Sequence, residues 1–206
     1  MSMQLRNSSL RYGVVAQTLH WAVVALIIAQ FVLAWSAADL PLGIHKLALL
    51  ARHKSVGMTI MALAAARLAW RLVNPISPLP PRTSTWQRWA AHTAHGLLYV
   101  LLFAVPLMGW LMSSAKNYTV SWFNLITLPN LVAPNEVLFE AFRTTHEVLA
   151  VTLLVIAVGH ALAALKHEFI DRDNVLRRML PIRLRNETPA ANVTRTDSVP
   201  LGKDSL

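Results

Sequence analysis

The chain of 206 residues contains no cysteine, which excludes disulfides, thiolate zinc sites and iron–sulfur clusters. Charged residues are also scarce, at 14%, whereas hydrophobic residues make up 55% and the mean hydropathy is +0.45. Such a composition is too apolar for an ordinary soluble domain. Histidine, which occurs eight times, is the only strong nitrogen ligand left, so any bound metal must be held by imidazole.

Four apolar stretches have the length of about 20 residues that a helix needs to cross a bilayer. They are residues 14–36, 53–73, 92–113 and 143–165. We therefore predict an all-α membrane protein, with a four-transmembrane-helix up-and-down bundle over residues 14–182. Residues 1–13 are expected to form a short cytoplasmic lead and residues 186–206 a disordered cytoplasmic tail. The long connection 114–142 is expected to lie along the outer surface as a lid.

The formal net charge is +9, which in a soluble protein would suggest nucleic-acid binding. Here the basic residues lie between and after the apolar spans, so we expect a membrane and no nucleic acid as partner. Five of the 19 Lys and Arg residues fall on one side and the other 14 on the opposite side, which predicts both termini in the cytoplasm. The five outer residues are Lys46, Arg52, Lys54, Lys116 and Arg143.

The fourth span carries two histidines, His146 and His160. A helix turns by about 100° and rises by about 1.5 Å per residue, so both lie on one face, about 21 Å apart. His20 stands near the start of the first span, and His53 opens the second. Because successive spans run in opposite directions, depth pairs His20 with His160 near the inner face (the inner pair). Depth likewise pairs His53 with His146 near the outer face (the outer pair).

Two neutral imidazoles that face each other suit the axial positions of haem iron. Zinc and copper sites usually need more ligands, and no acidic residue except Glu147 occurs at these depths. No CxxCH motif is present for covalent attachment, so the haem would be of the b type. An iron with two axial histidines has no open position for oxygen and is suited to electron transfer. The sequence therefore predicts two haem b groups, held by the inner pair and the outer pair.

Two further residues of the second span are candidates for cofactor binding. Gly57, four residues after His53, would let a flat cofactor approach the backbone. Arg67 follows His53 by 14 residues, the spacing of His146 and His160, so it is predicted to face the same interior. Two interpretations of Arg67 stay open: it binds an acidic cofactor group such as a haem propionate, or it extends to the membrane interface.

Other histidines have several interpretations. His45 is expected to be a solvated loop residue. His92 and His95 form an HxxH pair at the inner edge, which fits metal ligation, hydrogen bonds to headgroups or haem propionates, or proton handling at a quinone pocket. If His160 is not the inner ligand, the alternatives on the same side are His92, His95 and His167.

Four segments of the chain resemble the bacterial cytochrome b561 family, which is itself similar to the membrane cytochrome b subunits of nickel–iron hydrogenases and formate dehydrogenases. They cover about residues 11–182. They are RYGVVAQTLHW around His20, HKSVGMTIMALAAARLAWRL from His53, AHTAHGLLYVLLFAVPLMGWLM in the third span, and THEVLAVTLLVIAVGHALAALKHEFIDRDNVLRRMLP in the fourth span and its exit.

The resemblance implies a multi-pass, two-haem oxidoreductase of the bacterial inner membrane that serves respiratory electron transport. It implies His20, His53, His146 and His160 as axial ligands and ubiquinone or another quinone as redox partner. Some relatives are superoxide oxidases, and the five outer basic residues would attract the superoxide anion. The alternative is a membrane anchor that relays electrons from a soluble hydrogenase or dehydrogenase subunit. A histidine-lined metal or proton transporter is a third possibility, against which the lack of carboxylates within the spans argues.

Overall fold

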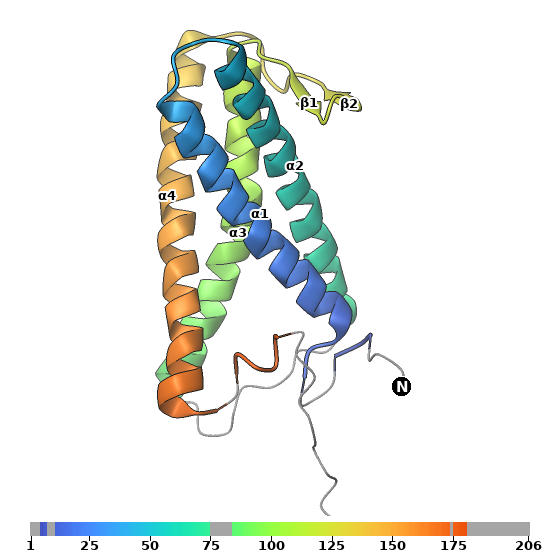
Figure 1. Ribbon diagram of the computed structural model, residues 1–206, viewed down its shortest axis with the longest axis vertical. Helices are drawn as coiled ribbons and strands as arrows, with labels where there is room; N and C mark the ends of the chain where they lie inside the picture. Colours follow the sequence, from blue (N-terminus) through green and yellow to red (C-terminus); the bar gives the residue numbers. More distant parts are fainter. Residues whose placement is uncertain (1–4, 8–10, 75–83, 174, 181–206) are drawn as a thin grey trace, which may run out of the picture.

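The computed structural model describes residues 5–7, 11–74, 84–173 and 175–180. Four long helices run alternately up and down, and each is long and apolar enough to cross a membrane, which confirms the predicted all-α membrane bundle (Figure 1). The predicted tail 186–206 lies outside the described residues. The elements are α1 (Val14–Ala38), α2 (Ile44–Val73), α3 (Thr85–Ala115), β1 (Val120–Trp122), β2 (Ile126–Leu128), α4 (Glu136–Lys166) and the π-helical turn η1 (His167–Asp171).

Three of the helices begin earlier than the apolar spans predicted. Residues 44–52 of α2 contain neither glycine nor proline, so the helix continues outward through a segment that the sequence analysis assigned to a loop. Ser84 and Gln87 form a capping box at the start of α3, and the Asn135 side chain accepts a hydrogen bond from the Leu138 amide at the start of α4. Counting apolar residues alone misses such polar helix ends.

The helices form two antiparallel pairs, α1 with α2 and α3 with α4, and α2 also packs on α3. A small core of Val23, Ile60, Ala64 and Leu102 lies between α1, α2 and α3. Over the described part of the chain, no backbone contact joins α4 to α1 or to α2. The space between α4 and the first pair is therefore bridged by side chains only.

The connection between α3 and α4 folds into a two-stranded hairpin that packs beside α2 and the end of α3 (Figure 1). Its base is tied to two buried serines at the end of α3. The Tyr118 amide donates to the Ser113 carbonyl (2.8 Å), and the Leu131 amide donates to Ser114 Oγ (3.1 Å). The segment was expected to be a lid along the outer surface; in the structure these bonds tie its base to α3, and β1 packs on α2.

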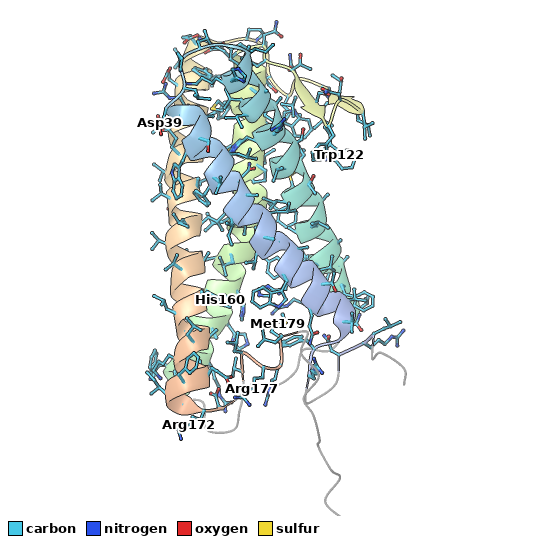
Figure 2. The ribbon with its side chains drawn as sticks, viewed as in Figure 1. Asp39, Trp122, His160, Arg172, Arg177 and Met179 are labelled. Atoms are coloured by element: carbon cyan, nitrogen blue, oxygen red, sulfur yellow. The ribbon has the colours of Figure 1, made fainter. Side chains whose placement is uncertain are left out.

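At the opposite end of the bundle, residues 176–180 fold back beneath the start of α1, and we call them the strap. Trp21 Nε1 donates to the Met179 carbonyl (2.8 Å), and Gln17 Nε2 donates to the Arg178 carbonyl (3.2 Å). Gln17 is only 3% exposed and its Nε2 also donates to the Tyr12 carbonyl (3.0 Å), so its amide is committed to backbone partners. Figure 2 shows Met179 at the same end of the bundle as His160.

We expect Trp21→Phe to loosen the strap, because the ring is kept and the bond to Met179 is lost. A hydrogen bond contributes about 1 kcal/mol, which corresponds to roughly fivefold more of the detached state. Limited trypsin digestion should then cleave after Arg177 or Arg178 about fivefold faster. Trp86→Phe, at an exposed position of α3, is the control, and equal cleavage of both variants would contradict the expectation.

Candidate functional site

The outer pair joins α2 to α4. The ring centroids of His53 and His146 lie 6.2 Å apart, with the ring planes at 74°. His146 Nδ1 lies 2.9 Å from the Val105 carbonyl oxygen, so Nδ1 carries the proton and donates it there. The Nε2 lone pair of His146 is thereby left available for a metal. His53 Nδ1 is buried and has no hydrogen-bond partner within the described residues.

A cavity of about 230 Å³ surrounds the outer pair, with walls from all four long helices. Its lining is largely apolar, and Leu101, Leu102 and Leu153 in it are buried. Gly57 also lines the cavity, where a Cβ atom would lie 3.1 Å from Gln30 Nε2, and its role beside a flat cofactor stays a prediction. An apolar cavity with two imidazoles suits a flat, largely apolar cofactor that contains a metal.

Gly109 is a site residue that the sequence analysis missed. A Cβ atom at this position would lie 3.1 Å from His146 Cε1 and 3.2 Å from His146 Nδ1. The glycine therefore lets the imidazole lie against α3, one helical turn from the Val105 carbonyl that orients it. A glycine within an apolar helix is the one sequence feature that indicates such a close approach.

The inner pair joins α1 to α4. The ring centroids of His20 and His160 lie 6.4 Å apart, with the planes at 83°. The ring centroids of Trp21 and His20 lie 5.3 Å apart. Because Trp21 also hydrogen-bonds Met179, it connects the strap to the inner pair. His95 approaches from α3, and its ring centroid is 5.1 Å from that of His160.

The ring separations distinguish a metal-sized gap from a direct contact. A metal bonds an imidazole nitrogen at about 2 Å, and this nitrogen lies about 1.1 Å from the ring centre, so two imidazoles across one metal have centroids roughly 6.3 Å apart. The outer pair and the inner pair, at 6.2 and 6.4 Å, match that separation. His95 and His160, at 5.1 Å, have no room for an ion between them. The two predicted pairs therefore fit a bis-imidazole iron, and His95 is an additional neighbour.

Arg67 lies near the inner pair, close enough for its positive charge to act on the rings of His20 and His160. Its Nε donates to the Tyr99 hydroxyl (3.2 Å). Its Nη1 is buried and has no partner within the described residues. An unpaired buried guanidinium nitrogen is costly, and an acidic cofactor group would satisfy it.

The HxxH histidines do not act as a unit. His92 Nδ1 lies 2.6 Å from the Arg88 carbonyl oxygen and the residue is exposed, whereas His95 turns towards His160. His92 and His95 therefore do not face a common point at which both could bind one metal ion.

The remaining two histidines lie at opposite ends of the bundle. His45 is exposed, as expected, although it belongs to the first turn of α2 rather than to a loop. His167 Nδ1 lies 2.6 Å from Asp173 Oδ2 and 3.2 Å from Asp171 Oδ2, and Asp171 also pairs with Lys166. The imidazole of His167 is thus engaged by carboxylates where α4 ends.

Comparison with known proteins accounts for this arrangement. The family model of prokaryotic cytochrome b561 matches residues 11–181. The chain is 34% identical to cytochrome b561 homolog 2 of Escherichia coli K12, over 86% of this chain and 95% of that protein. It is 30% identical to a probable superoxide oxidase CybB of Yersinia pestis, over 87% of this chain and 98% of that protein. The chain therefore belongs to the prokaryotic cytochrome b561 family, whose members are membrane electron-transfer proteins that carry b-type haem.

Proposed function

We propose that the chain binds two haem b groups, one between His53 and His146 and one between His20 and His160, and conducts electrons across the membrane between them. The observation that carries this proposal is the pair of metal-sized imidazole gaps along α4, which over the described residues meets α1 and α2 through side chains only. The two histidines of α4 are 14 residues apart, or about 21 Å. Haem supplies the one-electron chemistry.

The protein's own residues orient and shield the cofactors. The Val105 carbonyl fixes the tautomer and the plane of the His146 ring, and the apolar walls of the cavity exclude water. At the inner pair, Arg67 offers its unpaired Nη1 to an acidic group of the haem, with Tyr99 holding the guanidinium in place. Gly57 would form part of the cavity wall around the outer haem.

Removing one histidine tests the assignment of the sites. We expect His160→Ala to lower the content from two haems per chain to about one, because the outer pair is about 21 Å away along α4 and is left intact. Pyridine haemochrome assay against protein concentration measures this ratio, and exposed His45→Ala serves as the control. Retention of both haems would assign the inner iron to His95, His92 or His167 instead.

Two glycines of α3 provide a matched test of the outer pair. We expect Gly109→Ala to push the His146 ring out of position and to reduce haem occupancy several-fold, because the new Cβ would lie 3.1 Å from the ring. Gly96→Ala should leave occupancy unchanged, since no atom lies within 4 Å of a Cβ there. Haem content and the absorption spectra of the two purified variants decide the question, and equal occupancy would show that Gly109 has no such role.

We further propose that the chain oxidises superoxide at the outer pair and reduces ubiquinone or another quinone. Two superoxide anions each lose one electron to give O₂, and one quinone takes up two electrons and two protons. Supporting this, the chain is 30% identical to the probable superoxide oxidase of Yersinia pestis. The 14-to-5 distribution of Lys and Arg further supports the bacterial inner membrane, with both termini in the cytoplasm and the outer pair on the periplasmic side.

The structure separates the outer basic residues into two groups. Lys116 pairs with Glu136 (2.6 Å), and Arg143 is flanked by two glutamates, so each is largely neutralised. Over the described residues, no carboxylate lies within ion-pair distance of Lys46, Arg52 or Lys54. These three residues therefore provide the positive field that would steer an anion towards the outer pair.

Neutralising the three unpaired cations tests this steering. The triple variant Lys46→Gln, Arg52→Gln, Lys54→Gln should lower the rate of superoxide-driven quinone reduction by roughly tenfold at low ionic strength and flatten its salt dependence. Lys166→Gln with Arg172→Gln, at the other end of the bundle, is the control. An unchanged rate would reject superoxide steering by this surface, and co-purification of a soluble redox subunit would favour the electron-relay function.

A further inference from the structure

The hairpin β1–β2 is bound to one particular stretch of α2. The Phe123 amide donates to Ser55 Oγ (3.0 Å), and Ser55 Oγ lies 3.0 Å from the Ser121 carbonyl oxygen. Further along α2, Trp122 Nε1 donates to Thr59 Oγ1 (3.0 Å). Figure 2 shows Trp122 beside α2, below the end of the bundle. The hairpin therefore lies along the side of the helix and not above it.

The depth of these contacts follows from α4. The stretch between Glu147 and Lys166 contains no charged residue and is about 28 Å long as a helix, close to the roughly 30 Å of a bilayer's apolar core. His146 therefore stands at the border of that core, and His53 faces it. Ser55 and Thr59 follow His53 by two and six residues, or about 3 and 9 Å further into the membrane. The hairpin is thus held at and within the border.

The surface that the hairpin presents is apolar. Residues 117–134 contain no charged side chain. At the tip, Phe123 is 50% exposed, Leu125 79% and Ile126 52%. If these side chains faced water, each Å² of their apolar surface would cost about 25 cal/mol of free energy. The hairpin packs on α2, a helix long and apolar enough to cross a membrane, so lipid is the occupant that fits this uncharged, apolar tip.

The turn at the tip keeps a large side chain in an unfavourable backbone conformation. Phe123 and Asn124 have φ angles of 48° and 58°, and the Leu125 amide bonds the Trp122 carbonyl (2.9 Å). Such turns favour Asn and Gly, and a bulky residue there costs about 1–2 kcal/mol. The turn therefore does not explain why residue 123 is a phenylalanine, and the contacts that its exposed ring makes are the better explanation.

Cations and aromatic rings lie where lipid headgroups would be. Lys54 Nζ lies 5.6 Å from the centre of the Tyr118 ring and 3.4 Å from the Thr119 carbonyl oxygen. At the base of the hairpin, the Glu136 carboxylate raises the pKa of Lys116 above its ordinary value, which keeps that amine charged. Lysine and tyrosine are typical of the boundary between acyl chains and phosphates.

We propose that the hairpin β1–β2 is an interfacial anchor that inserts Phe123, Leu125 and Ile126 into the headgroup–acyl boundary of the adjacent lipid leaflet. The anchor holds the outer part of α2 through Ser55, two residues from His53. Lipid packing around the hairpin thereby steadies the helix that carries one member of the outer pair. The proposal depends on the membrane location of the bundle, and not on which histidines bind haem.

The absence of cysteine permits a direct test, because each Leu125→Cys chain carries one nitroxide label only. The labelled full-length protein is reconstituted in vesicles of phosphatidylethanolamine and phosphatidylglycerol, and its collisions with O₂ and with a water-soluble nickel chelate are measured by electron paramagnetic resonance. Val155→Cys, which is 64% exposed in the middle of α4, is the lipid reference. His45→Cys, about 12 Å outward from His53 along α2, is the aqueous reference.

We expect the O₂-to-nickel collision ratio at Leu125 to exceed that at His45 at least several-fold and to approach that at Val155. Ile126→Cys repeats the measurement at a second exposed position, in case Leu125→Cys does not fold. A nickel collision rate at both positions equal to that at His45 would overturn the proposal and place the hairpin in water. Because the labels report depth alone, the result is independent of haem content and of quinone reduction.

Discussion

The structure depends on imidazole side chains that face each other across a space where helices do not meet. In an apolar medium a lone imidazole has no water to bind, so it needs a partner in the protein or on a cofactor. Helix α4 packs on α3, but over the described residues only side chains connect it to α1 and α2. The separations of 6.2 and 6.4 Å leave room for one metal ion in each pair. A haem at each gap would therefore supply both the chemistry and the missing contact between the two halves of the bundle.

The outer pair and the inner pair have different polar neighbours. At the outer pair the backbone carbonyl of Val105 orients His146, and Glu147 is the charged residue in the lining of the cavity. At the inner pair Arg67 and His95 are close neighbours of His160. Of these two neighbours Arg67 is the cation, and a cation beside a haem would favour the reduced, less positive iron.

Much of the fold and the pairing of the histidines was predictable from the sequence, because both follow from local periodicity. The apolar spans gave the four helices, and the spacing of His146 and His160, together with alternating helix direction, gave the two depths. The predicted beginnings of α2, α3 and α4 were wrong, since polar helical turns extend beyond the bilayer. The ligand roles of the four histidines stay predictions.

Features that depend on contacts between distant residues were not predictable. Gly109 matters only because His146, on another helix, lies against it, and Gln17 only because its side chain reaches the carbonyl of Arg178, 161 residues away. Likewise, the unpaired Nη1 of Arg67 is a property of the packed site and not of the span that carries the residue. The spacing of residues along the chain indicates how deep a residue lies in the membrane but not which distant residues surround it.

Both ends of the bundle show the same means of holding a histidine in place. Beneath the inner pair, the strap binds Trp21, the residue next to His20. Beside the outer pair, the hairpin binds Ser55, two residues after His53. The strap thus holds α1 and the hairpin holds α2, the two helices that have no backbone contact with α4 over the described residues. Part of the constraint on each imidazole gap therefore comes from a short segment that hydrogen-bonds the helix close to its histidine.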